Sequence, residues 1–476
     1  MTVGVGRKRA ARPRALWRED VCAQCGGAAK AGRAPLPDRF DSFEERRAAG
    51  RKIRRRVPRA EHALWKPRPD RDDPLELLRA IHRGRLQTVL PIKWGRMAAS
   101  PFGFFRGAAA VMASDMARLS TTGIHVQICG DAHLRNLGAY AAPDGHLVFD
   151  INDFDESVHG PWEWDLKRLS TSVVLAGREA GEPDRACGEA VEILVRSYRE
   201  SLVEFARMPA LRLFRFEIGS MPGRNPVGAA LRKAERETPL RTLEKLTVNR
   251  KGGRAFARRP RLLEPVSPEI RRMVLAALVP YRLTISEDRQ LILAAFYPAD
   301  VAFKAVGVGS LGTRDYVVLC EGSAPKDILF LQVKEEPPSC YAPYLAASPD
   351  PSHQGHRVAR AQHRMQTISD PFLGWTTIRD RDFLVRQLAD HKAAITPTDL
   401  SGKSLEEYAR VCGRLFAKAH ARTGDPAVLS GYCGASNKLD VALKKFALAY
   451  ADQTAADHDR LLRAIRRGQI QARRGV

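Results

Sequence analysis

Acidic and amide side chains cluster in two short stretches of the first third of the chain, residues 127–136 (QICGDAHLRN) and 147–156 (LVFDINDFDE). Each stretch is associated with an apolar run of strand character, IHVQI for the first and HLVF for the second. Pro143-Asp144-Gly145 between them is typical of a turn, so the sequence predicts a loop followed by a short hairpin. Carboxylates packed this densely repel one another unless a cation lies among them. A divalent metal ion that bridges phosphate groups would supply that charge.

The spacing of these residues indicates a particular chemistry. Asp131 and Asn136 are five positions apart, the interval of a catalytic loop in which an acid orients a hydroxyl nucleophile and an amide holds Mg²⁺. Asp153 follows where a second metal-binding acid is expected, and Asp155 and Asp150 are alternative ligands. We therefore expect Asp131 to orient an acceptor hydroxyl and receive its proton, and Asn136 and Asp153 to bind Mg²⁺.

The same residues resemble the aminoglycoside-phosphotransferase and choline-kinase branch of the protein-kinase-like superfamily, whose loop reads roughly H-G-D-x-H-x-x-N, then I-D-F. More closely, GDAHLRN, FDINDFDE and PWEWDLKRL resemble a bacterial family known as domain of unknown function 2252. The resemblance implies that His133 braces the loop and that Cys129 replaces a mainly architectural histidine. It also implies that Asp165 buttresses the loop from the start of a helix, although an acid there also fits an ordinary helix start.

A second cluster lies far downstream. Gly307, Gly309 and Gly312 form a G-x-G-x-x-G pattern, followed by the strand-like runs DYVVLC and ILFLQVK, the second ending at Lys334. Glycines let a backbone approach phosphates, and a lysine on a strand can pair with them. These residues resemble the nucleotide-binding lobe of a kinase and predict ATP as a ligand.

This cluster departs from the kinase pattern in two ways. Arg314 stands where a valine usually covers the adenine, and the predicted helix at 356–366, which would carry the partner of the lysine, contains no Glu. Gln362, Glu335 and Glu336 are the remaining candidate partners of Lys334.

The order of the two clusters is the reverse of that in ordinary kinases, where the glycine loop and lysine precede the catalytic loop. Either the motifs are coincidental or the chain is a circular permutation of a kinase-like fold. Permutation is physically feasible when chain ends lie near each other at a surface. It also accounts for AKAHA near the C-terminus, which resembles the kinase helix that precedes the catalytic loop. We expect an α+β, two-lobed, circularly permuted kinase-like fold with extra helices.

Four segments are predicted on this basis. Residues 1–55 form a basic, flexible extension, 56–294 a helix-rich lobe with the catalytic loop, 295–395 a strand-rich nucleotide-binding lobe, and 396–476 helices that pack on the catalytic lobe. Within the extension, Cys22 and Cys25 resemble half of a zinc knuckle, but no second ligand pair stands nearby.

The bulk properties narrow the class of protein. Residues 1–60 hold 17 Lys and Arg against 6 Asp and Glu, within a net charge of +24, so this basic arm could contact nucleic acid, although strong base-reading motifs are absent. No uninterrupted run of 18 apolar residues and no apolar signal region occur, and eight cysteines in 476 residues do not suggest a disulfide scaffold. We expect a cytoplasmic protein without a membrane span.

The function expected from these features is ATP-dependent transfer of a phosphoryl group to the hydroxyl of an unknown, small-molecule acceptor. Two alternatives belong to other classes. One is a nucleotide-binding pseudokinase, or an enzyme that transfers AMP, because fold alone does not separate these chemistries. The other is a metal-dependent hydrolase, because Asp and His clusters can hold two metal ions; its candidate ligands are Asp131, His133, Asp150, Asp153 and Asp155.

Overall fold

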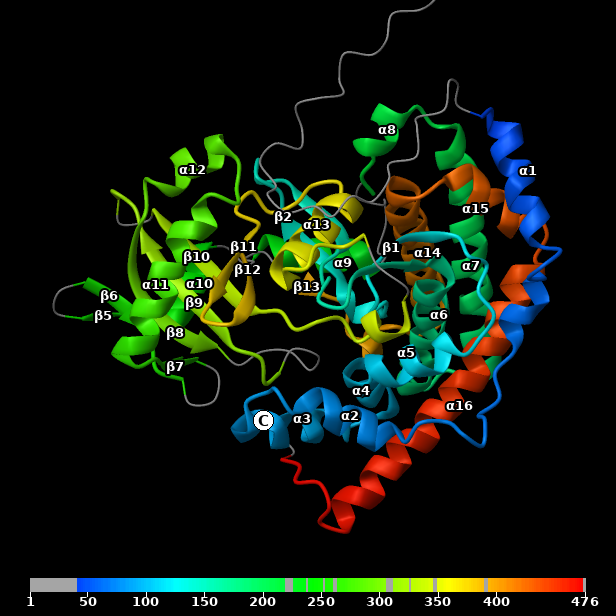
Figure 1. Cartoon of the computed structure of the whole chain (residues 1–476), viewed down its shortest axis with the longest axis horizontal. Coiled ribbons are helices and arrows are strands. Elements are labelled where there is room, and N and C mark those ends of the chain that lie inside the picture. The colour runs from blue at the N-terminus through cyan, green and yellow to red at the C-terminus, as the bar shows by residue number, and fades with distance from the viewer. Residues whose placement is uncertain are drawn as a thin grey trace, which may run out of the picture. The chain divides into compact units, whose positions relative to one another are not determined.

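The computed structural model describes residues 41–218, 226–236, 239–250, 253–259, 263–304, 311–324, 327–345, 349–388 and 393–473 (Figure 1). Its backbone contacts separate Met1–Ser42 from a compact unit, Phe43–Val476. The unit mixes helices and sheets, which confirms the α+β class. Gly307, Gly309, Cys22 and Cys25 lie outside the described residues.

Five long or buried helices form the helical core, and both halves of the chain contribute to it. Helix α7 (Asp184–Arg207) places apolar residues at helical spacing on one buried face, as the periodicity predicts. Helix α14 (Lys403–Thr423) packs closely along it, because Gly413 leaves room for the carbonyl of Leu194, which a Cβ would meet. The other members are α6 (Trp162–Glu179), α15 (Pro426–Cys433) and α16 (Lys438–Arg466), drawn at the right of Figure 1.

An antiparallel six-stranded sheet in the order β11-β12-β10-β9-β8-β7 forms the second part of the unit. Three of its strands follow one another as hairpins, and helix α13 (Gln354–Met365) then leads to the two strands on the far side. Its strands are β7 (Leu263–Pro265), β8 (Tyr297–Lys304), β9 (Asp315–Glu321), β10 (Ile328–Glu335), β11 (Gly374–Ile378) and β12 (Arg381–Gln387). Helices α10 (Pro239–Leu246), α11 (Pro268–Arg282) and α12 (Glu287–Leu293) and the hairpin β5 (Thr247–Arg250) and β6 (Gly253–Phe256) belong with it.

The two acidic stretches lie on short strands against the helical core. Strand β1 (His125–Ile128) pairs with β4 (Val158–Pro161), and β2 (Leu137–Ala141) forms a hairpin with β3 (Leu147–Ile151), as the turn signal predicts. Strand β13 (Ala393–Ala394), which follows the sheet in sequence, adds to the outer edge of β2. Helix α9 (Pro226–Glu235) packs on the same small sheet.

The predicted extension at 1–55 is too long, because its last part is a helix. Helix α1 (Phe43–Ile53) packs against α15, and Gly50 lies where any Cβ would meet the carbonyl of Val428. Arg54 Nε donates to the carbonyl of Tyr432 at 2.8 Å, and Arg59 Nη1 donates to that of Cys433 at 2.7 Å. These guanidiniums satisfy carbonyls at the C-terminal end of α15, where cations are favoured.

The predicted start of the strand-rich segment at residue 295 is too late. Strand β7 joins the sheet from residue 263, and α11 packs on β11, so the sheet recruits residues well before 295. The remaining helices between α1 and the loop are α2 (Pro74–His82), α3 (Leu90–Met97), α4 (Pro101–Gly107) and α5 (Ala109–Ala117), and a short α8 (Ala210–Phe214) follows α7. Within the described ranges, no helix has the length and apolar character needed to cross a bilayer.

Candidate functional site

The loop between β1 and β2 has a fixed backbone. Gly130 adopts a φ of +77° and lies against the carbonyl of Glu156, so a side chain at this position would be both strained and obstructed. Asn136 Nδ2 donates to the backbone carbonyl of Asp131 at 2.8 Å, which closes the five-residue interval seen in the sequence. Two buried tyrosines hold loop carbonyls from outside. Tyr341 Oη donates to Gly130 O and Tyr408 Oη to Leu134 O, both at 2.7 Å.

Asp165 lies directly beneath this loop, in the first turn of α6. Its carboxylate accepts the backbone N–H of Cys129 at 2.8 Å and that of Gly130 at 2.9 Å, and His420 Nε2 is 3.3 Å away. The side chain of Asp165 is fully buried. A buried carboxylate that receives two backbone donors fixes the position of the loop, which is the bracing geometry that the resemblance implies.

Asp131 contacts an arginine that the sequence reasoning did not single out. Arg168, three residues after Asp165 on α6 and fully buried, donates to Asp131 Oδ1 from Nε at 2.8 Å and from Nη2 at 2.5 Å. The i, i+3 spacing places both residues on one face of the helix, so it was the available signal. His133 Nε2 lies 3.6 Å from the other oxygen of Asp131. Burial, followed by Arg106 and Arg168, lowers the pKa of His133 well below its ordinary value, so His133 is neutral.

Lys334 from β10 reaches the acidic hairpin segment from the other part of the chain. Its Nζ forms an ion pair with Asp155, 179 residues away in sequence, and lies 3.4 Å from Glu336 Oε1. Burial disfavours the charge of Lys334, but Asp155, Glu336 and Asp153 outweigh it and raise its pKa. Burial also opposes the charge of Asp155, yet the ion pair with Lys334 lowers the pKa of Asp155 to about 2.

The neighbouring acids have pKa values shifted the other way. Burial and then the Asp155 carboxylate raise the pKa of Asp153 to about 6, and the same two causes raise that of Glu336 to about 8. Both carboxylate oxygens of Glu336 are buried without a hydrogen-bond partner. Lys334 and Arg386 both act on Asp153 and Asp155, and the raised pKa of Asp153 is the feature that a cation bound beside it would reverse.

Of the three candidate partners of Lys334, only Glu336 contacts it. The carboxylate of Glu335 is held by Arg314 Nη1 at 3.0 Å and Arg381 Nη1 at 2.6 Å. Gln362 Nε2 donates instead to Gln366 Oε1 at 3.0 Å. Glu336 stands two positions after Lys334, directly beyond the last residue of β10, where its N–H donates to Asp382 O at 2.9 Å.

Asp150 is engaged away from these acids. Its Oδ2 forms a fully buried ion pair with Lys418 of α14, and its Oδ1 accepts the N–H of Ile151 at 2.8 Å. Burial lowers the pKa of Lys418 although Asp150 acts against it. The pair satisfies two charges inside the helical core, so Asp150 is not available as the alternative metal ligand.

The described end of the glycine loop is anchored rather than open. Gly312 has a φ of +99°, and its carbonyl accepts the N–H of Leu86 at 2.7 Å. Arg85 Nη1 donates to Leu311 O at 3.0 Å. The segment before α3 therefore fixes the point at which the chain enters β9.

A polar row on the sheet adjoins Lys334. Arg386 Nε donates to Gln332 Oε1 at 2.9 Å, and Gln332 Nε2 donates to Asp315 Oδ2 at 2.7 Å. Burial raises the pKa of Asp315 to about 6, although Lys304 acts in the opposite direction. Polar residues inside otherwise apolar strands were the only sequence signal for this row, because its partners come from different strands.

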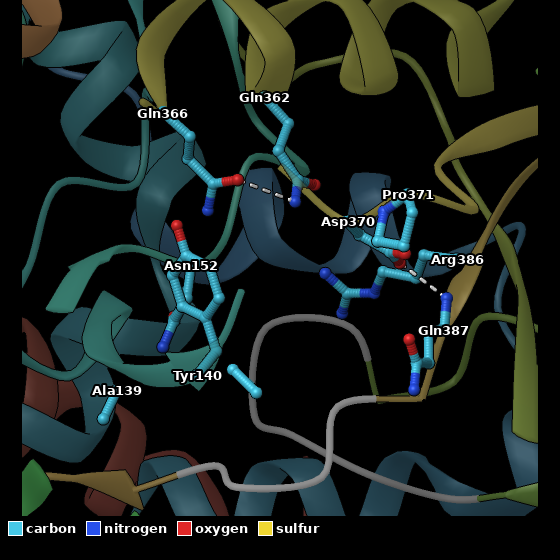
Figure 2. A pocket seen from close by; sticks show the side chains of 10 residues that line it. Ala139, Tyr140, Asn152, Gln362, Gln366, Asp370, Pro371, Arg386 and Gln387 are labelled. Atoms are coloured by element: carbon cyan, nitrogen blue, oxygen red, sulfur yellow. Dashed lines mark hydrogen bonds between the residues drawn. The ribbon is translucent and has the colours of Figure 1, made fainter. Parts of the chain in front are cut away.

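A narrow cavity of about 80 Å³, measured as the space open to the centre of a water molecule, lies between β12, α13 and the β2–β3 hairpin. Figure 2 shows the guanidinium of Arg386 directed toward its middle, with the hydrogen-bonded amides of Gln362 and Gln366 at one side. Asn152, the residue before Asp153, lies at another wall beside Tyr140. Amide side chains, Asp370 and Arg386 supply its polar groups, but the cavity is too small in this state for a nucleobase.

The chain provides Mg²⁺ with ligands of the right type but with few of them. Within the described ranges, no group of three or more His, Cys, Asp and Glu side chains is arranged to hold a metal ion. The hydrolase alternative requires such a group. Of its five candidate ligands, Asp150 is ion-paired with Lys418 and His133 is buried. Mg²⁺ in nucleotide sites commonly uses one or two carboxylates and completes its shell with phosphate oxygens and water. Asp153 and the amide oxygen of Asn136 fit that smaller demand.

Comparison of the sequence with protein families shows to which family the chain belongs. A family described as an uncharacterized protein conserved in bacteria (DUF2252) matches residues 85–464. The chain belongs to the DUF2252 family. The DUF2252 match includes the loop, the acidic hairpin, Lys334 and α14, and leaves α1 and α2 outside. No curated protein and no solved structure matches the chain.

Proposed function

We propose that this DUF2252 protein is an ATP-dependent phosphotransferase that acts on a hydroxyl group of a small molecule. The observation that carries the proposal is the ion pair between Lys334 and Asp155. It joins a strand-borne lysine to the acids that follow the Asp131–Asn136 loop, which is the combination that phosphoryl transfer requires.

The order of elements supports a circularly permuted kinase-like fold. Lys334 lies on the third of three consecutive hairpin strands, β8, β9 and β10, and a helix, α13, follows before the last two strands. In protein kinases the phosphate-binding lysine is likewise on the third strand. Strand β13 then leads into α14, whose AKAHA segment packs under β1 and the loop. Reading the sheet and α14 before residue 125 restores the kinase order.

The roles follow from these contacts. Lys334 would pair with phosphate oxygens when a nucleotide is bound, and Asn136 and Asp153 would hold Mg²⁺, which would neutralise phosphate charge. Asp131 would orient the acceptor hydroxyl through Oδ2, because Oδ1 is bound by Arg168. Asp165 and Glu336 would hold the loop and the lysine in position. Most of the rate acceleration in such a site comes from positioning and charge neutralisation.

The contact between Arg168 and Asp131 also favours a second candidate function. The buried guanidinium of Arg168 occupies one oxygen of the Asp131 carboxylate, which leaves a single oxygen to engage an acceptor and suits a protein that binds Mg-ATP without transferring phosphate. AMP transfer belongs to the same alternative, because it uses the same nucleotide site. Incubation with γ-labelled and α-labelled ATP separates the three outcomes by which label, if either, is transferred.

The proposal is tested by thermal unfolding with ATP, in the presence and absence of Mg²⁺, at pH 7.5. We expect ATP with Mg²⁺ to raise the Tm of the wild type, and we expect Asp153→Ala to abolish the metal-dependent part of the shift. Asp452→Ala, at an exposed position of α16, is the matched control and should behave like the wild type. Absence of any metal-dependent shift in the wild type would contradict both the transferase and the nucleotide-binding alternative.

A further inference from the structure

A second and larger cavity lies on the opposite side of α13 from the narrow cavity. Its volume, measured in the same way, is about 630 Å³, within the range of small-molecule sites of about 300–1,000 Å³. The walls come from α8, α13, α14 and β11. Gln362 of α13 and Gln366 directly after it line the narrow cavity, whereas His356, Arg360 and Arg364 of the helix line the larger one.

The larger cavity carries an excess of positive charge. Among its described lining residues are three arginines, two histidines and no carboxylate. Arg422 is a structural member, because it donates to the carbonyls of Arg364 and Gln366 at 3.0 and 2.9 Å. Arg360 donates to Pro349 O at 2.9 Å and forms an ion pair at 3.4 Å with Asp350, an acid with a buried side chain that does not line the cavity.

Arg360 and Arg364 lie one helical turn apart and face the same cavity. Arg364 is exposed and Arg360 is half-buried. Burial and then Arg360 lower the pKa of His356, and burial likewise lowers that of His363. Neighbouring imidazoles therefore remain neutral, and the positive potential of the cavity comes from guanidinium groups that persist at every physiological pH.

An aromatic wall stands beside these cations. The ring of His356 stacks on Trp375 with a centroid distance of 3.9 Å and an interplanar angle of 11°. Phe214 is 62% exposed, and the guanidinium of Arg422 lies 4.7 Å from the centre of its ring. A large exposed aromatic beside a basic cavity is the kind of surface that a ligand with an apolar body would cover.

We propose that this cavity binds a small organic phosphate. The phosphate would contact Arg360 and Arg364, whose planar guanidiniums match several acceptor oxygens at once, and the apolar or ring portion would lie against Trp375 and Phe214. The site is separate from the candidate catalytic residues, so the proposal does not depend on the proposed function.

Phenyl phosphate is a suitable probe because it combines both features, and inorganic phosphate and phenol each supply one. Calorimetric titration at low ionic strength should show saturable binding of phenyl phosphate that is tighter than that of either fragment. Arg364→Gln and, independently, Arg360→Gln should weaken it about tenfold, the effect of losing one charge-assisted hydrogen bond. Arg410→Gln, at an exposed position of α14, removes the same charge elsewhere and should bind like the wild type.

Lys334→Met distinguishes this site from the nucleotide site and should leave the binding of phenyl phosphate unchanged. Three results would overturn the proposal. They are the absence of saturable binding, equal affinity in the wild type and both pocket variants, and loss of binding in Lys334→Met but not in the pocket variants. The Tm of each variant, measured without ligand, shows whether it is folded; the two arginine variants provide independent readings if one is not.

Discussion

Lys334 lies among three acidic side chains. Asp155 takes the ion pair, Glu336 lies 3.4 Å away, and Asp153 contributes a third carboxylate. Burial of these acids is unfavourable, and it raises the pKa values of Asp153 and Glu336 although Lys334, Arg386 and Arg357 act against it. These two raised pKa values predict the direction in which metal binding and the free energy of unfolding change with pH.

The first consequence concerns Asp153, whose pKa is about 6. A proton and a metal ion compete for the same carboxylate, so Mg²⁺ binding should weaken as the pH falls through 6. We expect the Mg²⁺-dependent part of the ATP-induced Tm shift to be full at pH 7.5. The apparent affinity for Mg²⁺ should be about tenfold lower at pH 5. Titration with MgCl₂ at fixed ATP over this range measures it. A constant affinity would exclude Asp153 as a ligand.

The second consequence concerns Glu336, whose pKa is about 8 in the folded protein against an ordinary value of 4.5. Between these values the folded protein holds a proton that the unfolded chain has released, so the free energy of unfolding falls as the pH rises. The slope from this one group reaches at most about 1.4 kcal/mol per pH unit. Glu336→Gln should flatten the dependence of stability on pH between 5 and 8, relative to the wild type.

Urea unfolding at several pH values tests the Glu336 prediction. Glu189→Gln, at a partly exposed position of α7, changes the same chemical group and should leave the slope as in the wild type. Parallel curves for the wild type and Glu336→Gln would show that Glu336 is ionised in the folded state.

At the scale of elements, helix α6 is the part that organises the loop. Asp165 and Arg168 stand one turn apart on its buried face, and one accepts two loop N–H groups while the other donates to Asp131. A helix is a rigid support, so the relative position of backbone brace and acidic side chain is fixed. A substitution of Asp165 should therefore shift the position of Asp131 although the Asp131 side chain is unchanged.

Asp165→Asn tests this support. The substitution puts an amide where two backbone donors converge, and we expect a loss of about 2–4 kcal/mol in the free energy of unfolding. Asp440→Asn is the matched control, because Asp440 is equally buried and accepts from Arg199 Nε at 3.0 Å. Both variants should lose stability, but only Asp165→Asn should also lose the Mg²⁺-dependent effect of ATP, measured below the Tm of each. Retention of that effect in both variants would show that α6 does not position the site.

The elements could be predicted from the sequence more fully than their contacts. The strand-like runs DYVVLC and ILFLQVK correspond to β9 and β10, and AKAHA falls in α14, as its resemblance to a helix predicts. Ser404 and Glu407 have the spacing of a capping box, but Ser404 does not cap the helix. The helix begins at Lys403, after Gly402 with a φ of +53°, and Ser404 Oγ donates back to Ser401 O at 2.8 Å. The turn at Gly402, which its positive φ permits, therefore starts the helix one residue before Ser404.

The contacts within the candidate site could be anticipated where the residues are close along the chain or share the motifs of the family resemblance. Asp131, Asn136 and Asp165 are close in sequence, and their contacts follow from a loop and the helix beneath it. The pairing of Asp150 with Lys418 could not be predicted, because the partners are 268 residues apart and only the fold brings α14 to β3. For the same reason Asp150 was indistinguishable from Asp153 as a metal ligand in the sequence.

At the scale of the whole molecule, the candidate site is shared by segments from both halves of the chain. If ATP binds there, it should slow amide exchange in residues 147–156 and in residues 328–336 together. Hydrogen–deuterium exchange with Mg-ATP measures both at once, with the last turns of α16 as an internal reference that should not change. Protection confined to one of the two segments would contradict a shared site.

The two tyrosines that hold the loop also set an order of events during synthesis. Tyr341 and Tyr408 contact the carbonyls of Gly130 and Leu134 across 211 and 274 residues. A ribosome adding about 5–20 residues per second therefore releases the acidic loop well before either tyrosine exists. During that interval the apolar faces of α6 and α7 that α14 later covers are exposed. We expect chaperones that bind apolar surfaces to act on this chain before the loop reaches its final conformation.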